Sequence, residues 1–211
     1  MENISTETYS RPTSVGAHSD VSRALPAAIE RTGSAPRAAG RDAAVLHISV
    51  VATPLGPMLL GTTEDAVRLL QFTGVSLLDE QLQRLAAKLK YRLTLGPCAV
   101  GRRMEEELAA YFAGTSASFS TPLQPVGTDF QQAAWQALSA IPYGQTRSYG
   151  EQARMVGRPS AVRAVARANG ANPIAIVVPC HRVIGADGTL TGYGGELWRK
   201  QWLLDLEGAG S

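Results

Sequence analysis

The most constraining feature of the sequence is a run of short helices with clear start and stop signals between residues 128 and 170. Thr128 is a good N-cap residue, and apolar residues then recur at helical spacing from Phe130 to Leu138. The segment Ile141–Gly144 has the composition of a turn and ends this helix. The pattern predicts that this part of the chain is built mainly from helices.

Two further helices are predicted directly after that turn. Ser148 and Glu151 form a capping box, which starts a short helix that stops at Gly157. Pro159 is placed as the first residue of the next helix, which ends near Gly170. Two helices joined by a turn of about three residues have the geometry of a helix-turn-helix.

The second of these helices has an unusually small surface. Its predicted buried face consists of Val162, Val165 and Ala166. Arg163 and Arg167 share the far side, because they are four residues apart. The positions between these faces are Ala161, Ala164 and Ala168. Small residues with arginine suit close docking on a sugar-phosphate surface or in a minor groove. Alanine chosen for helix propensity alone explains the same pattern.

The first 124 residues divide into a tail and a small α/β unit. Residues 1–44 are rich in Ser, Thr, Ala, Pro and Gly and predict a flexible tail. This tail has no apolar core of a secretory signal and is too acidic for a mitochondrial presequence, so we expect a cytoplasmic protein. Residues 45–124 predict an antiparallel meander with strands at Leu46–Val50, Met58–Leu60 and Ala66–Phe72. Helices are expected at Leu77–Leu89 and around Met104–Phe112.

Positive charge is concentrated between residues 141 and 200, in a chain whose net charge is only +2. This segment carries eight bases and three acids. The bases are Arg147, Arg154, Arg158, Arg163, Arg167, Arg182, Arg199 and Lys200. Such a surplus is typical of a phosphate-binding surface, although a solvated basic face has the same composition.

A cysteine follows a predicted buried strand at Ile174–Val178. Only a few per cent of a free thiol is thiolate at neutral pH, so Cys180 needs activation if it is to react. His181 is the nearest base, but consecutive side chains of an extended segment point apart. Contact would need a bridging water or a sharp turn. The pair fits a thiol hydrolase, a redox sensor, an alkyl acceptor or an inert buried cysteine.

An ordered series of short motifs resembles the methylated-DNA–protein-cysteine methyltransferases, also called O6-alkylguanine-DNA alkyltransferases. The motifs are IPYG at 141–144, SY at 148–149, RAV at 163–165, NP at 172–173, PCHRVI at 179–184, GY at 192–193, and LL and EG at 203–204 and 207–208. The resemblance covers residues 45–208 and is densest from residue 129 onward. It implies a ribonuclease-H-like α/β domain at 45–124, then a mainly helical, winged-helix-like domain at 125–211 that carries the helix-turn-helix.

The resemblance also implies the chemistry. Cys180 would accept a methyl group from O6 of guanine in DNA, and by extension from O4 of thymine, once per molecule. His181 would draw the thiol proton through a water, and Glu207 would orient His181. Asn172 would hold the active-site turn and Tyr149 would donate a proton to the departing guanine. No cofactor is implied.

DNA contacts follow from the same resemblance. Arg163 would fill the gap left by a flipped nucleotide, on a helix docked in the minor groove of double-stranded DNA. The other predicted DNA-binding residues are Ala161, Ala164, Arg167, Ser148 and Tyr149. The predicted base pocket consists of Tyr193, Gly194, Val183 and Pro179. Some members carry a serine at the position of Gly194. Glycine has no side chain, so only the backbone amide of Gly194 could contact the base. We expect a monomer with no membrane contact, and leave cooperative assembly on DNA open.

Two alternatives to methyl transfer, and the possibility of a zinc site, are considered on the sequence alone. A non-catalytic lesion-binding or transcriptional regulatory protein would use the same helices without chemistry. Lesion-binding relatives replace the acceptor cysteine and regulatory ones add a cysteine-bearing domain, whereas this chain keeps Cys180 and otherwise contains only Cys98. Cys98 is predicted to be a packed core thiol. Some members bind zinc through their first domain, but His47 and Cys98 do not supply such a set, so no metal is predicted.

Overall fold

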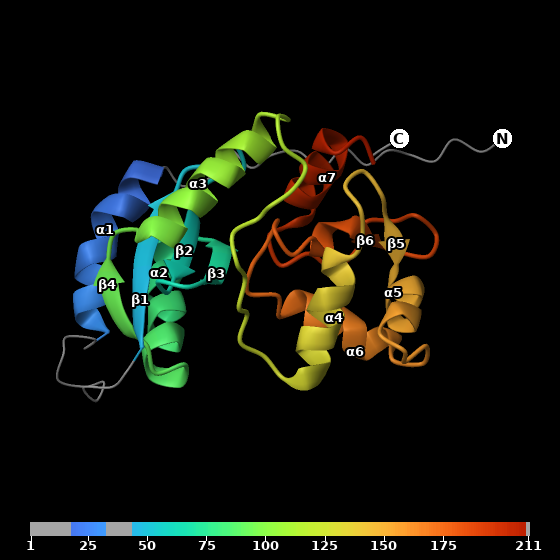
Figure 1. Cartoon of the computed structure of the whole chain (residues 1–211), viewed down its shortest axis with the longest axis horizontal. Helices are drawn as coiled ribbons and strands as arrows, with labels where there is room; N and C mark the ends of the chain where they lie inside the picture. The colour runs from blue at the N-terminus through green and yellow to red at the C-terminus, as the bar shows by residue number, and fades with distance from the viewer. Residues whose placement is uncertain (1–17, 33–43, 210–211) are drawn as a thin grey trace.

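The computed structural model describes residues 18–32 and 44–209. Figure 1 shows two parts side by side, a sheet flanked by helices and a mainly helical part. This is the predicted order of an α/β unit followed by a helical unit. Among the described residues, no helix is long and apolar enough to cross a membrane.

The sheet contains four strands in the order β3–β2–β1–β4. They are β1 (Val45–Val51), β2 (Met58–Thr62), β3 (Val67–Phe72) and β4 (Arg92–Leu95). The first three form the predicted antiparallel meander, while β4 pairs with β1 in parallel. Every residue of β2 is buried, because helices cover both faces of the sheet.

Helices α2 (Val75–Gln83) and α3 (Ala99–Phe112) lie on opposite faces of this sheet (Figure 1). The predicted helix at Leu77–Leu89 is confirmed as α2 and its continuation, the π-helical turn η1 (Arg84–Lys88). The successive strand residues Leu59 and Leu60 belong to different hydrophobic clusters, as the alternation of a strand requires.

The prediction of a flexible tail is wrong for α1 (His18–Arg31), a helix that packs beside α2. Its buried residues are Val21, Leu25 and Ala28. Arg31 also forms an ion pair with Asp79 of α2 at 2.7 Å. The sequence hides this helix because its apolar stripe has only these three positions and is interrupted by Pro26. Residues 1–17 and 33–43, also assigned to the tail, lie outside the described residues.

The helical part consists of α4 (Asp129–Ser139), α5 (Tyr149–Met155), α6 (Val162–Gly170) and α7 (Leu197–Leu206). A two-residue parallel pair, β5 (Arg147–Ser148) with β6 (Val183–Ile184), joins distant segments. Capping boxes at Thr128 and Ser148 start α4 and α5, so the predicted starts of both helices are confirmed. The prediction for α6 is wrong by three residues. Pro159 lies in the preceding turn, where the Ala161 amide donates to the Arg158 carbonyl at 2.9 Å and the fixed φ of proline suits the second position.

The buried face of α6 also differs from the prediction. It consists of Val165, Ala168 and Asn169, whereas Val162 is 38% exposed and Ala166 is exposed. Polar contacts decide this orientation. The Trp135 indole of α4 donates to the Ala168 carbonyl at 2.8 Å. The Gln152 and Asn169 side-chain amides exchange two hydrogen bonds. A helical wheel that sorts residues by hydrophobicity misses both contacts.

The segment Ile174–Val178 is buried as predicted, but it is a series of turns and not a strand. Its backbone pairs with the edge of β3 only at the start, where the Leu70 amide donates to the Pro173 carbonyl and the Ala175 amide donates to the Leu70 carbonyl. Ile176 then adopts φ of 72°, which bends the chain sharply. The sheet of the first part thus anchors the segment that leads to Cys180.

Candidate active site and nucleic-acid interface

Asn172 holds the turns that precede the cysteine. Its side-chain oxygen accepts from the Ile174 amide at 3.0 Å, and its Nδ2 donates to the Val178 carbonyl at 2.8 Å. The same Nδ2 lies 3.4 Å from the Cys180 sulfur. These bonds satisfy backbone groups that no strand partner reaches, so the irregular segment can be buried. Asn172 thus lies in the turns that lead to Cys180, and its part in catalysis stays a prediction.

Cys180 begins the 3-10 turn η2 (Cys180–Arg182). This turn is the kind of sharp bend that contact between Cys180 and His181 was predicted to need. The cysteine is 8% exposed. Burial raises the pKa of its thiol, and the Asn172 hydrogen bond and the charge of Lys200 oppose this rise only in part. The resting sulfur is therefore a thiol, and a reaction at this sulfur requires a base.

His181 and Glu207 form a fully buried pair in which Nε2 lies 2.9 Å from Oε1. Burial lowers the pKa of His181 despite the hydrogen bond to Glu207, so the imidazole is neutral. A carboxylate can only accept, so Nε2 carries the ring proton and Nδ1 is left as an unprotonated acceptor. Nδ1 is buried and has no hydrogen-bond partner among the described residues. The pair thus holds a free base beside the cysteine turn.

Glu207 stays ionised because several donors converge on it. Arg182 donates to both carboxylate oxygens, at 2.8 and 2.9 Å. The Tyr111 hydroxyl donates to Oε1 at 2.7 Å and the Gly144 amide to Oε2 at 3.3 Å. Burial alone would raise the pKa of Glu207, but the hydrogen bonds from His181 and Arg182 outweigh it and lower the pKa to about 2.

The sequence did not reveal the part of Arg182 and Tyr111 in this network. On the sequence alone, Arg182 is one of the bases of a predicted phosphate-binding or solvated surface, and no role is assigned to Tyr111. Burial raises the pKa of Tyr111, and the Glu207 charge adds to the effect, so its hydroxyl remains a donor. The sequence shows that Arg182 is close to Cys180 in the chain. It carries no local signal for the contact between Tyr111 of α3 and Glu207, because these residues are 96 positions apart.

A cavity of about 200 Å³ opens beside Cys180. Its lining includes Asn172, Tyr193 and Gly194, so three of the predicted site residues meet the cysteine there. Two other predicted pocket residues, Pro179 and Val183, are buried and do not line this cavity. The Tyr193 hydroxyl is buried without a hydrogen-bond partner in the described part of the chain. A polar ligand in the cavity could supply that partner.

Tyr149 and Lys200 secure the loop that carries the cavity wall. The Tyr149 hydroxyl donates to the carbonyls of Thr191 at 3.1 Å and Gly192 at 3.3 Å. Lys200 Nζ donates to the carbonyls of Val183 at 2.6 Å and Thr191 at 2.7 Å. Burial lowers the pKa of Lys200 to about 8, against the opposing effect of Cys180. Tyr149 does not line the cavity itself.

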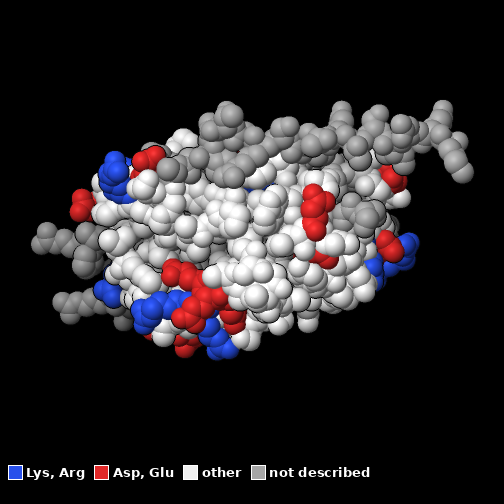
Figure 2. All heavy atoms as spheres, turned by 90° about the horizontal axis from the view of Figure 1, so that it is seen from above, with Lys and Arg blue, Asp and Glu red and all other residues white. Residues whose placement is uncertain are grey.

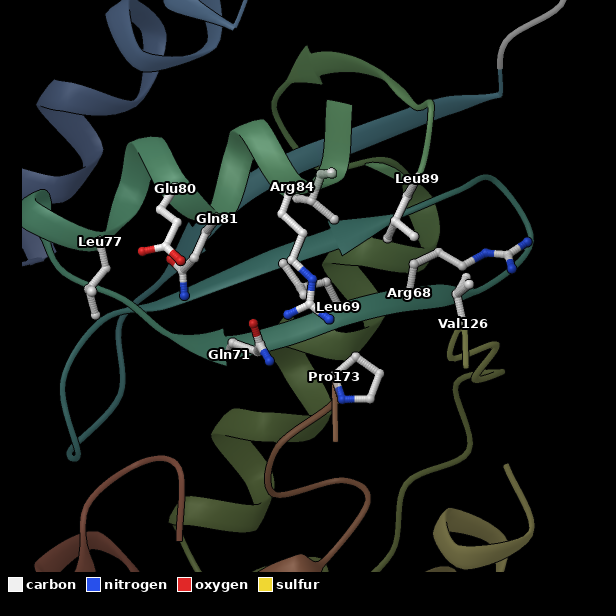
Figure 3. A pocket seen from close by; sticks show the side chains of 11 residues that line it. Arg68, Leu69, Gln71, Leu77, Glu80, Gln81, Arg84, Leu89, Val126 and Pro173 are labelled. Atoms are coloured by element: carbon white, nitrogen blue, oxygen red, sulfur yellow. The ribbon is translucent and has the colours of Figure 1, made fainter. Parts of the chain in front are cut away.

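A second hollow of about 200 Å³ adjoins this cavity and is drawn in Figure 3. Both are lined by Gln71, Leu77 and Gln81, which come from β3 and α2. Pro173, which precedes the cysteine turns, closes the other side of the hollow (Figure 3). The first part of the molecule therefore supplies one wall of the cavity beside Cys180.

The exposed surface of α6 carries the predicted nucleic-acid contacts. Arg163 and Arg167 are exposed, and Ala161 and Ala164 are partly exposed. The interpretation of the basic segment as a surface needs correction, because Arg182, Arg199 and Lys200 are buried. Ser148 is occupied in its capping box. Figure 2 views the side of α3 and α7, which faces away from α6, and on this side acidic and basic side chains are intermixed.

Comparison with known proteins assigns a class first to the helical part. A family model described as the DNA binding domain of 6-O-methylguanine DNA methyltransferase matches residues 129–209. The structure of Mycobacterium tuberculosis OGT in complex with DNA superposes with a TM-score of 0.66 at 45% identity, covering 78% of this chain and 94% of that one. The helical part is thus a DNA-binding domain of this class.

Whole-chain relatives extend this result. A methylated-DNA–protein-cysteine methyltransferase of Mycobacterium bovis is 45% identical over 163 residues, covering 77% of this chain and 93% of that protein. One of Methanosarcina acetivorans is 43% identical over 169 residues, covering 78% and 99%. The chain belongs to the methylated-DNA–protein-cysteine methyltransferase family.

Proposed function

We propose that this protein repairs DNA by transferring the methyl group of O6-methylguanine to its own Cys180. The sulfur attacks the methyl carbon, a carbon–sulfur bond forms, and the bond from the methyl carbon to O6 breaks. Guanine is restored in the DNA. The thioether product has no route back to a thiol, so each molecule reacts once.

The free Nδ1 of His181 is the observation that carries this proposal. It is an unprotonated acceptor, held by the bond from Nε2 to Glu207 at 2.9 Å. We infer that it takes the thiol proton of Cys180 through one water. The resulting imidazolium is stabilised by the ionised Glu207, as in the triads of hydrolases. A thiolate then exists only while the neighbouring base holds its proton.

The remaining site residues take supporting roles in this proposal. Asn172 fixes the turn and lies close enough to donate to the sulfur. Tyr149 is close to the cavity wall, and its hydroxyl would protonate the departing guanine after leaving the Thr191 carbonyl. Tyr193 and the Gly194 backbone would contact the base. Pro179 and Val183, the other predicted pocket residues, are buried outside the lining of the cavity and have no direct contact with the base in this proposal.

Recognition of DNA is proposed for the exposed surface of α6. Arg163 would occupy the space of the flipped nucleotide, while Ala161 and Ala164 permit close approach to a minor groove. Arg167 would pair with a phosphate, and Ser148 and Tyr149 lie at the start of the neighbouring helix α5. The exposure of both arginines supports this arrangement.

The finer organisation is part of the same proposal. Residues 45–124 would form the ribonuclease-H-like domain, onto which α1 packs. Residues 125–211 would form the winged-helix-like domain, which contains the β5–β6 pair. The protein would act as a monomer on double-stranded DNA in the cytoplasm, with any cooperativity confined to the DNA-bound state.

Intact mass and peptide mapping test the function. The full chain is mixed with a small excess of duplex oligonucleotide carrying one O6-methylguanine. We expect one added methyl group per protein on the peptide containing Cys180, with an equal amount of guanine restored. Tight binding without added mass would replace the proposal with lesion sensing. A parallel duplex with O4-methylthymine measures the breadth of the activity.

A further inference from the structure

Three side chains with metal-binding atoms converge at the edge of the first part, far from Cys180 in the sequence. The ligand atoms of His47, Glu64 and Cys98 all lie within 4.8 Å of one another. His47 Nε2 and a Glu64 oxygen are 2.8 Å apart. The prediction of no metal rested on His47 and Cys98, which alone are too few ligands; Glu64 adds a third ligand to them.

The three residues come from segments that the fold holds firmly. His47 in β1 pairs with Thr62 of β2, and Glu64 follows two residues later in the turn before β3. Cys98 is the N-cap of α3. Its sulfur lies 3.3 Å from the Thr62 hydroxyl and donates to the Thr63 carbonyl at 3.3 Å. A preformed site of this kind needs little rearrangement to accept an ion.

The donor atoms define which ion fits. An imidazole nitrogen, a carboxylate oxygen and a thiolate are the ligands of zinc, and three protein ligands leave a fourth tetrahedral position for water. Cys98 is the N-cap residue of α3, so the start of a helix of 14 residues fixes its position. Once the thiol proton is lost, the Thr62 hydroxyl can donate to the sulfur and orient it.

The three side chains of the site differ in their exposure to solvent. The Glu64 side chain is 70% exposed and His47 is 23% exposed, while Cys98 is buried. An ion can therefore enter past Glu64 and reach the sulfur last. We propose that His47, Glu64 and Cys98 bind one Zn²⁺, which fastens β1 and the β2–β3 turn to the start of α3. This proposal is independent of methyl transfer.

Cobalt binding tests the site in the full-length chain. Cys180→Ser leaves Cys98 as the only cysteine of the protein, so a thiolate-to-cobalt charge-transfer band can report only on Cys98. We expect one Co²⁺ per chain with this band, and its loss when Zn²⁺ is added. No band, or a band that Zn²⁺ does not remove, would overturn the proposal.

Ligand variants in the same background complete the test. Cys98→Ser should abolish the band, and Glu64→Ala should weaken binding by at least the roughly 10- to 100-fold that loss of an outer-shell partner costs. Asp65→Asn is the matched control, because Asp65 is the neighbouring exposed carboxylate outside the group. Far-ultraviolet circular dichroism verifies that each variant is folded. Equal weakening by Glu64→Ala and Asp65→Asn would contradict the assignment.

Discussion

The two cysteines of this protein are buried to the same degree, at 7% exposure for Cys98 and 8% for Cys180. Their surroundings differ. Cys98 donates to the Thr63 carbonyl within the sheet part. Cys180 lies on a cavity wall beside a neutral imidazole whose Nδ1 is free among the described residues. Burial therefore does not distinguish the two thiols. The histidine–carboxylate pair beside Cys180 is fully buried, whereas the His47–Glu64 pair near Cys98 is open to solvent.

The largest expected effect separates these cysteines directly. Cys180→Ser should abolish methyl transfer, because the serine hydroxyl is a far weaker nucleophile under the same base. Cys98→Ser should leave the extent of transfer unchanged. Both variants are treated with the methylated duplex and weighed intact. Added mass on the Cys180→Ser protein would contradict the comparison.

Removing the negative charge behind His181 is the next largest change. Glu207→Gln leaves Arg182 without its buried counter-ion, which should lower the free energy of unfolding by about 3–5 kcal/mol. The transfer rate should fall at least about 100-fold, because the histidine loses the group that orients it. Denaturant titration and rapid-quench kinetics measure the two effects. Glu106→Gln, an exposed carboxylate of α3, is the control and should change stability by less than about 0.5 kcal/mol.

Acid should weaken the same network. The pKa of Glu207 falls from 4.5 to about 2 on folding, so its contribution is complete above pH 4.5 and is lost as the pH falls toward 2. The shift corresponds to about 3 kcal/mol. The lowered pKa of His181 acts in the same direction, with loss beginning as the pH falls through the usual histidine range. Unfolding free energies measured from pH 7 to pH 2 test this. A Glu207→Gln variant with the same slope below pH 4.5 would refute it.

The bond from α3 to Glu207 should contribute less. Tyr111→Phe removes one hydrogen bond to a charged group and should cost about 1.5–3 kcal/mol of stability, with a small loss of transfer rate. Tyr143→Phe is the matched control, since the Tyr143 hydroxyl donates to the Leu206 backbone carbonyl. If both variants have equal transfer rates, Tyr111 does not position Glu207.

The smallest expected effect is on the rate at which a methylated base in duplex DNA reaches Cys180. Arg163→Ala should slow transfer from duplex DNA about tenfold, equivalent to about 1.4 kcal/mol, because the flipped-out state loses a stabilising side chain. Reaction with free O6-methylguanine should be unchanged. Single-turnover rates with the two substrates give the ratio. Arg158→Ala, an exposed arginine of the preceding turn, serves as control.

Local signals in the sequence predicted the parts of the fold that depend on local chemistry. The caps at Thr128 and Ser148 and the alternating strands of the meander are examples. Each is set by hydrogen bonds or side-chain periodicity within a few residues. The helix α1 and the turns at Ile174–Val178 could not be predicted in this way. Their stability comes from packing on α2 and from hydrogen bonds to β3 and Asn172, which are distant in the sequence.

The sequence by itself indicated the class of chemistry, because the ordered motifs around Cys180, His181 and Glu207 resemble those of one family. Only the tertiary structure decided how these groups work. It turned Arg182 and Lys200 inward, brought Tyr111 to Glu207, and placed Glu64 beside His47 and Cys98. The physical reason is that a buried charge must be matched by donors or counter-ions, and a fold collects these from segments that share no local pattern.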